Sequence, residues 1–219
     1  MSHARYHHGD LRNALLEAAD ALLEEKGLGG LTLRACARAA GVSHAAPAHH
    51  FGDIKGLLSA LAERGYKRLT SMLNEALAAV AGDLHEEMLA TAQAYVEFAE
   101  RYPEHFRIMF RSDLVGFPGD TRPDSIRATF ATLTNVILRQ RGDAEIPLED
   151  FFEPMPECLI DDIIMGWCHI HGYAHLKLEG QLGMIAEDNH AMHMQTAAHR
   201  LADLLQARHT PRANANSTS

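Results

Sequence analysis

Histidine is the residue type in this chain whose number and spacing could support chemistry. The 219 residues include 15 histidines. His171 and His175 lie one helical turn apart, as do His190 and His193, and histidines at such spacing can chelate a metal ion. A complete site needs a third and a fourth ligand with ordered outer partners. No His-Glu-x-x-His stretch or cysteine pair supplies them, so we expect no metal ion and no other cofactor.

Residue patterns that would indicate catalysis are also missing from the sequence. It has no Gly-x-Ser-x-Gly elbow, phosphate-binding loop or nucleotide-binding fingerprint. Asp161 and Asp162 are adjacent, so they point to different faces of a helix. Cys36, Cys158 and Cys168 have no disulfide or metal-ligand spacing and are expected to be reduced, mostly buried thiols. The sequence therefore does not predict an enzyme. The alternative left open is a His-rich helical metal-binding protein or metalloenzyme.

The stretch most suited to recognising another molecule lies between Leu31 and Phe51. Thr32 is placed to cap a short helix, Gly41 supplies the left-handed position of a tight turn, and Ser43 is placed to cap a second helix. A capped helix, a short turn with Gly and a second helix is the helix-turn-helix pattern. In that motif the second helix enters the DNA major groove. An ordinary αα-hairpin is the alternative interpretation.

The second helix, expected from Ser43 to His50, would read DNA without arginine or lysine. The residues expected to reach base edges are His44, Ala45, Ala46 and His49. Alanine methyls can pack on thymine methyls, whereas the bidentate contact to guanine is not available from this helix. A second set is expected to contact the phosphate backbone and so to position the motif: Thr32, Arg34, Ser43, His50 and Lys55.

The charge distribution favours docking on DNA by one end of the chain. Residues 1–70 carry nine lysines and arginines against seven aspartates and glutamates, whereas residues 71–219 carry eleven against twenty-two. Phosphate attracts the first segment and repels the second. This division argues against a further alternative, a helical adaptor that has lost DNA binding.

Helical periodicity without a competing strand pattern predicts an all-α protein. We expect a helix-turn-helix domain over residues 1–55, a helical effector-binding and dimerisation domain over 56–208, and a disordered tail over 209–219. The helices expected outside the motif cover residues 11–26, 57–77, 83–101, 104–110, 124–141, 157–178 and 187–207. The sequence has no run of 18 apolar residues and no signal segment at its start, so we expect a cytoplasmic protein.

The N-terminal pattern resembles the DNA-binding domain of the TetR (tetracycline-repressor-like) family of bacterial regulators. The resemblance covers residues 5 to about 68. It is carried by the opening of the first helix, Thr32–Arg34, Ala40–Ser43, His50-Phe51 and Leu57-Leu58. The chain departs from the family at Ala48, where an aromatic residue usually contacts phosphate, and at Ile54-Lys55, where Lys-Glu is usual.

Two later stretches resemble a TetR subgroup named for a Trp…His-Gly motif. They are Tyr102–Phe110 and the segment that holds Trp167, His171 and Gly172. The resemblance implies a C-terminal helical bundle that binds an unknown small-molecule effector. It also implies a ligand-responsive regulator, more often a repressor, with an operator DNA and a second copy of itself as partners. The ligand-binding residues expected on this basis are Phe106, Phe110, Trp167 and His171, with a core role for His171 as the alternative.

The dimer is expected to form through the last two long helices, around residues 158–178 and 187–207. Their small and apolar residues are the predicted interface: Ile160, Ile163, Ile164, Tyr173, Met194, Ala197, Ala198, Leu201 and Leu205. Two motifs related by a two-fold axis would then meet successive major grooves of a roughly palindromic operator.

Overall fold

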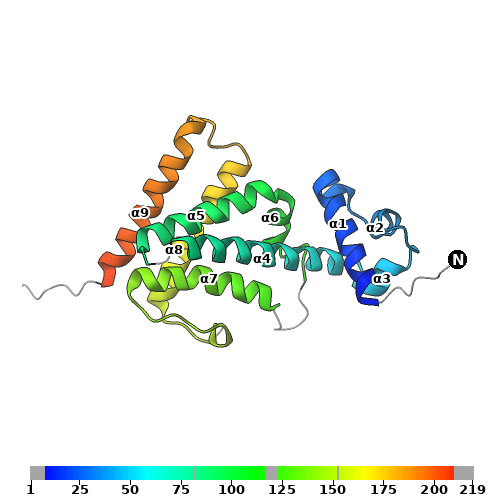
Figure 1. Ribbon diagram of the computed structural model, residues 1–219, viewed down its shortest axis with the longest axis horizontal. Helices are drawn as coiled ribbons and strands as arrows, with labels where there is room; N and C mark the ends of the chain where they lie inside the picture. The colour runs from blue at the N-terminus through cyan, green and yellow to red at the C-terminus, as the bar shows by residue number, and fades with distance from the viewer. Residues whose placement is uncertain (1–7, 81, 117–122, 152, 210–219) are drawn as a thin grey trace, which may run out of the picture. The chain divides into compact units, whose positions relative to one another are not determined.

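The computed structural model describes residues 8–80, 82–116, 123–151 and 153–209. Within these ranges the regular elements are α-helices and two short 3-10 helices, which confirms the all-α prediction. The elements of Figure 1 are α1 (His8–Gly30), α2 (Leu33–Ala39), α3 (Ala46–Phe51), α4 (Ile54–Ala79), α5 (Leu84–Arg101), α6 (Pro103–Met109), α7 (Asp124–Arg141), η1 (Leu148–Asp150), α8 (Glu157–Leu178), η2 (Glu187–Asn189) and α9 (His190–His209). The predicted tail, apart from its first residue, lies outside the described residues.

Side chains that precede the helices fix several of these boundaries. The amide of Gly56 donates to Oδ1 of Asp53 over 2.8 Å, so Asp53 caps α4. Asp83 accepts from the amide of His85 at 3.0 Å and begins α5 in the same way. α7 has the predicted bounds, and the backbone of α1 leaves helical geometry at Gly27, where the sequence predicted an end.

The first of two compact units comprises Met1–Arg68 and Arg101–Ile126. It contains α1, α2, α3, the first part of α4 and α6. Its core is built around Leu15, Cys36 and Leu61, which are fully buried. The thiol of Cys36 donates to the carbonyl of Leu15 at 3.1 Å, and burial raises the pKa of that thiol. Cys36 is therefore a packing residue that joins α2 to α1.

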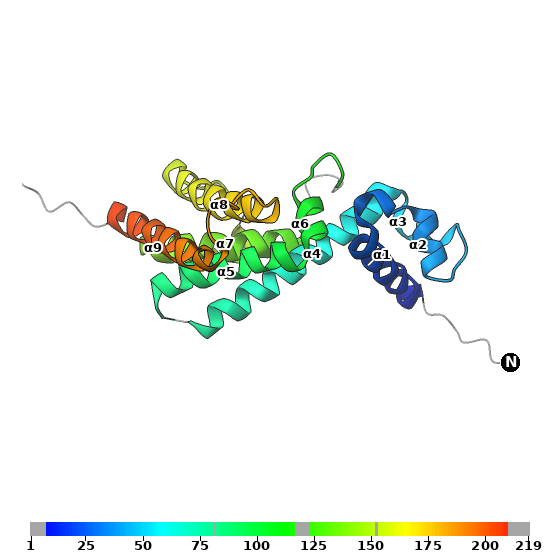
Figure 2. The ribbon, with the colours of Figure 1, turned by 90° about the horizontal axis from the view of Figure 1, so that it is seen from above.

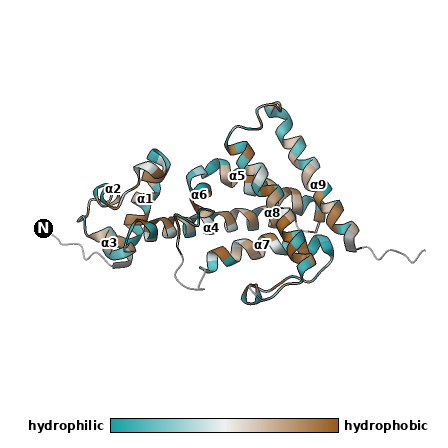
Figure 3. Ribbon diagram, turned by 180° about the vertical axis from the view of Figure 1, so that it is seen from behind, coloured by the Kyte–Doolittle hydropathy of each residue, from teal (hydrophilic) through white to brown (hydrophobic). Residues whose placement is uncertain are grey.

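The second unit comprises Leu69–Glu100 and Arg127–Ser219, with α5, α7, α8 and α9 around an apolar core. Figure 2 shows α8 beside α9, where the hydroxyl of Tyr173 donates to the carbonyl of His190 at 3.1 Å. Figure 3 shows that α8 is hydrophobic along much of its length. The predicted domain boundary after residue 55 stays a prediction, since α4 continues without interruption through Arg68 into this unit.

A buried ionic cluster around Asp20 holds the first unit together. Nε2 of His105 lies 2.7 Å from Oδ1 of Asp20, and Arg64 and Arg68 both bond the other carboxylate oxygen. Burial disfavours the charged carboxylate, but these hydrogen bonds and charges outweigh it and hold the pKa of Asp20 well below its usual range. The cluster therefore ties α1 to both α4 and α6.

We expect Asp20→Asn to lower the free energy of unfolding by about 2–4 kcal/mol, because two arginines and a histidine would lose their buried counter-charge. The pKa of Asp20 is lowered in the folded state, so its stabilisation is present above about pH 4 and is lost as the pH falls below that value. The matched control is Glu17→Gln, which removes the other partner of Arg64 from a largely exposed position and should cost less than about 1 kcal/mol. Urea unfolding measures both, and equal losses would contradict the prediction.

Candidate nucleic-acid interface and apolar cavity

The turn of the predicted helix-turn-helix motif has the expected geometry. The amide of Ala35 donates to the hydroxyl of Thr32 at 3.0 Å, so Thr32 caps α2. Gly41 has a φ of 67°, which the absence of a side chain permits, and the amide of Val42 returns to the carbonyl of Ala37 at 3.0 Å. These bonds close α2 and redirect the chain toward α3.

The second helix is shorter than the sequence predicted. α3 begins at Ala46 rather than at Ser43, and the residue at its N-cap position is Ala45, which makes no side-chain cap. The prediction that the hydroxyl of Ser43 caps this helix is therefore wrong. The physical reason is Pro47, whose fixed φ and missing amide hydrogen suit the first turn of a helix better than its middle. Ser43 and His44 precede α3 as a turn.

The residues predicted to contact DNA are accessible to a partner. Ala46 and His50 are half-buried. The other predicted residues are exposed: Thr32, Arg34, Ser43, His44, Ala45, His49 and Lys55. The rings of His49 and His50 lie 5.3 Å apart at the end of α3. Sequence spacing does not reveal a further cation there: the guanidinium of Arg12, on α1, lies 5.2 Å from the centre of the Phe51 ring. Arg12 adds a positive charge next to α3.

Lys55 lies at the start of α4 and has a neighbour that sequence spacing could not reveal. A Cβ placed on Gly116 would lie 2.5 Å from Cε of Lys55, so the lysine stem passes close to that glycine. Asp113 also lies near Lys55. A hydrogen bond from Arg111 lowers the pKa of Asp113 to about 2, and the charge of Lys55 adds to this effect. The segment from 111 to 116 therefore lies beside the Lys55 side chain.

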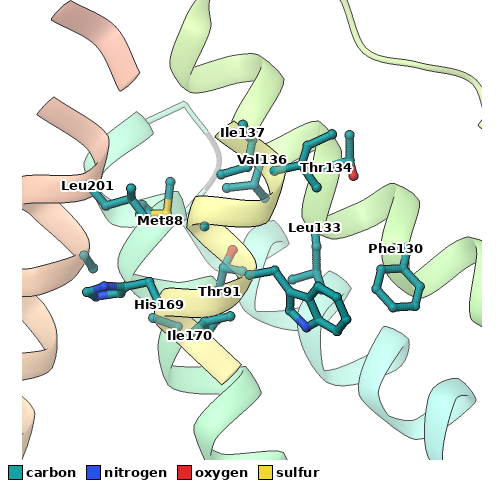
Figure 4. A pocket seen from close by; sticks show the side chains of 15 residues that line it. Met88, Thr91, Phe130, Leu133, Thr134, Val136, Ile137, His169, Ile170 and Leu201 are labelled. Carbon is teal, nitrogen blue, oxygen red and sulfur yellow. The ribbon is translucent and has the colours of Figure 1, made fainter. Parts of the chain in front are cut away.

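The second unit contains a cavity with an apolar lining (Figure 4). Its walls come from α5, α7, α8 and α9, and its lining includes Met88, Ala92, Phe130, Ile137, Trp167 and Leu201. The volume of the cavity is about 70 Å³. Protein interiors seldom leave such voids unfilled.

Of the four predicted ligand-binding residues, the structure places one at this cavity. Trp167 lines it and packs edge-to-face on Phe130, with ring centres 5.6 Å apart. The His171 ring lies 5.7 Å from that of Trp167 and is not part of the lining. Phe106 and Phe110 belong to the first unit, where their rings pack together at 5.4 Å, so they contribute nothing to this cavity.

His171 has a partner that the sequence did not indicate. The hydroxyl of Tyr95 lies 2.8 Å from its Nδ1, and the ring of His175 lies 4.6 Å away. Burial and the nearby His175 lower the pKa of His171 to about 4, so the imidazole is neutral near pH 7. This arrangement favours the core role that the sequence left as an alternative. The contact between Tyr95 and His171 joins α5 to α8 one turn after Trp167.

Metal binding and membrane insertion find no support in the part of the chain that the structure describes. No group of three or more histidine, cysteine, aspartate or glutamate side chains there is arranged to hold a metal ion. No described helix is both long enough and apolar enough to cross a bilayer.

Two protein-family models match the chain. The model for the "Tetracyclin repressor-like, C-terminal domain" matches residues 88–206, and that for "Bacterial regulatory proteins, tetR family" matches residues 15–61. No curated protein matches it.

Solved structures of similar fold cover nearly the whole chain. A protein of unknown function from Rhodococcus sp. RHA1 is 29% identical with a TM-score of 0.66, over 94% of this chain and 98% of that chain. A possible TetR family transcriptional regulator from Streptomyces coelicolor A3(2) is 19% identical with a TM-score of 0.62, over 90% and 99%. A TetR variant from Acinetobacter baumannii AYE, in complex with minocycline, is 19% identical with a TM-score of 0.59, over 94% and 99%. At 19% identity, the last two similarities show a shared fold alone.

The pair of His171 and Tyr95 predicts a pH dependence of stability. Because the pKa of His171 is lowered from 6.5 to about 4, the unfolded chain takes up this proton first as the pH falls. The contribution of His171 to stability should be complete above about pH 6.5 and should decline toward pH 4. We expect His171→Gln to be less stable at pH 7 but to lose less stability between pH 6.5 and 4.5, measured by urea unfolding. The exposed His193→Gln is the control, and an unchanged slope in His171→Gln would refute the assignment.

Proposed function

The chain belongs to the TetR family of bacterial DNA-binding transcriptional regulators, and we propose that it is a dimeric repressor that a small molecule releases from a palindromic operator. The observation that carries the ligand response is the apolar cavity of the second unit. A void between packed helices lowers stability unless something fills it, so a retained cavity favours a binding role.

In this proposal α3 and the turn before it read the operator. His44, Ala45, Ala46 and His49 would face base edges, while the exposed Thr32, Arg34 and Ser43 would contact phosphates together with His50 and Lys55. Arg12 would join the phosphate contacts, because its guanidinium lies at the end of α3. With Ala48 in place of the usual aromatic, Arg12 can supply a backbone contact from a different helix.

The proposed dimer keeps Ile160 and Ile164 from the set first expected but not its buried residues. Met194, Ala198, Leu201 and Leu205 are buried inside their own unit, so they cannot form the centre of an interface. A charge at Ala198 would therefore disrupt the core of one protomer rather than separate two. The exposed apolar residues of α8 and α9 are the better candidates: Ile160, Ile164, Leu176, Met192 and Leu204.

Effector binding would act by favouring one of two conformations. A ligand that binds the released form more tightly shifts the protein toward it, and coupling of about 1–3 kcal/mol is typical. The cavity and the exposed apolar residues share α8, so a ligand that displaces Trp167 would move the proposed dimer helix. The spacing of the two recognition helices, about 34–36 Å on a bound operator, would then change.

We also propose that the chain belongs to the Trp…His-Gly subgroup. Trp167 and His171 support it, since their rings lie 5.7 Å apart on one face of α8. The metal-binding alternative has no supporting cluster among the described residues.

Operator reading is tested by selecting duplexes with the full chain and titrating the selected site. We expect a half-site that contains thymine. At constant salt, the affinity should rise by about three- to tenfold between pH 8 and pH 6, because a charged imidazole binds phosphate and base acceptors more tightly than a neutral one. The double variant of His44→Ala and His49→Ala should remove most of this rise, while His193→Ala on α9 should keep it. Affinity that is flat with pH in the unmodified chain would contradict the imidazole contacts.

The dimer is tested by placing a carboxylate at Ile164, which is 49% exposed and therefore outside the core of its own unit. Burying this charge at an interface costs about 3–5 kcal/mol, so Ile164→Glu should be monomeric at micromolar concentration and should bind the operator weakly. The matched control is Leu148→Glu, which replaces an exposed apolar residue of η1. This variant should remain dimeric. Sedimentation velocity separates the two outcomes, and a dimeric Ile164→Glu would exclude this face as the interface.

A further inference from the structure

We infer that the effector is an uncharged, mainly apolar molecule with a flat ring that lies against Trp167. The inference rests on the proposed ligand response and names the class of ligand that the cavity accepts. It is carried by the chemistry of the lining, by the state of the nearest charged groups and by the position of Trp167.

The described residues that line the cavity include no Asp, Glu, Lys or Arg. Its hydroxyl groups belong to Thr91 and Thr134, both almost fully buried. The hydroxyl of Thr91 already donates to the carbonyl of Glu87 at 2.7 Å, so toward a ligand it can only accept. His169 also lines the cavity, but it is exposed, so water solvates its imidazole. The lining can therefore satisfy one or two polar atoms, but it offers no counter-charge.

The nearest buried charges are held by other residues. Glu87, on the α5 turn before the cavity, bonds Arg139 at 2.6 Å. Asp162, next to the lining residue Ile163, is bonded to Arg141. A charged ligand would have to break one of these buried pairs or remain unpaired in an apolar space, and either alternative weakens its binding. The cavity therefore discriminates against anions and cations alike.

The shape of the cavity indicates where the ligand enters. The interior is narrow in this form, so a ligand larger than a few atoms must displace a wall. Trp167 is the wall most able to move, because its side chain is 37% exposed at the mouth of the cavity. At the preceding residue, Gly166, α8 approaches α7 closely, since a Cβ there would lie 2.8 Å from Cδ1 of Ile137. A planar apolar ring that replaces part of the Trp167 contact suits this geometry.

A neutral and an anionic form of one ring system test the inference directly. N-phenylnaphthylamine is uncharged, and anilinonaphthalenesulfonate adds a sulfonate to the same rings. The full-length protein is titrated with each, and energy transfer from Trp167, the one tryptophan of the chain, reports occupancy of its neighbourhood. We expect saturable binding of one neutral probe per protomer and binding of the sulfonate that is weaker by at least about tenfold.

Variants that place a larger side chain in the cavity locate the bound probe. Ala92→Leu fills the cavity from α5 and should weaken the neutral probe by at least about tenfold, while Gln93→Leu adds the same side chain at the next, exposed position and should leave binding unchanged. Gly166→Ala is the second filling variant. Alanine favours helix over glycine, and its methyl group would meet only the flexible end of Ile137, so this variant should fold.

Three results would overturn the inference: no saturable binding of the neutral probe, equal affinity for both probes, or binding that persists in both filling variants. Release of the selected operator is measured separately. A ligand that releases DNA with equal effect in wild type and Ala92→Leu would overturn the cavity assignment and leave the ligand-responsive repressor in place. Neutral-probe binding without any DNA release would support the cavity chemistry and count against the repressor.

Discussion

The first unit depends on one buried carboxylate. Asp20 has little solvent to stabilise its charge, so its ionisation depends on Arg64, Arg68 and His105. These partners come from α4 and α6, which means that a single group on α1 sets the position of two other helices. α2 and α3 pack on α1 in turn, with the Cys36 thiol bonded to the carbonyl of Leu15. The recognition elements are therefore held by an ionic cluster rather than by apolar packing alone.

Local signals in the sequence were sufficient for most helix boundaries. Thr32 accepts an amide hydrogen bond where it was expected to, and Asp53 and Asp83 do the same before α4 and α5, because capping depends on residues within three positions of each other. The same local chemistry explains the error at α3. A proline can be placed in a helix at several positions by periodicity, but its ring favours the first turn, and the helix therefore starts at Ala46.

Contacts between distant parts of the chain could not be predicted. Periodicity shows which face of a helix is apolar but not which neighbour covers it, so Ala198 and Leu205 were assigned to an interface although their own unit buries them. Nor does spacing indicate that His105 meets Asp20 or that His171 meets Tyr95. The residues that line the candidate cavity could not be predicted for the same reason. An aromatic residue of a helical bundle is equally consistent with core and cavity, and the fold alone separates Trp167 from Phe106.

The contrast between buried ion pairs and apolar packing indicates how an uncharged effector would act on DNA binding. Such a ligand brings no charge, so it leaves the ionic pairs of Glu87 and Asp162 intact and works through packing. Allosteric coupling of about 1–3 kcal/mol is smaller than the roughly 3–5 kcal/mol lost when a buried ion pair is broken. The cluster around Asp20 should therefore survive the transition, and α1, α4 and α6 should keep their mutual contacts while the unit moves as one body. The change would then be concentrated where the packing is weakest, at the cavity and the partly exposed Trp167 of α8.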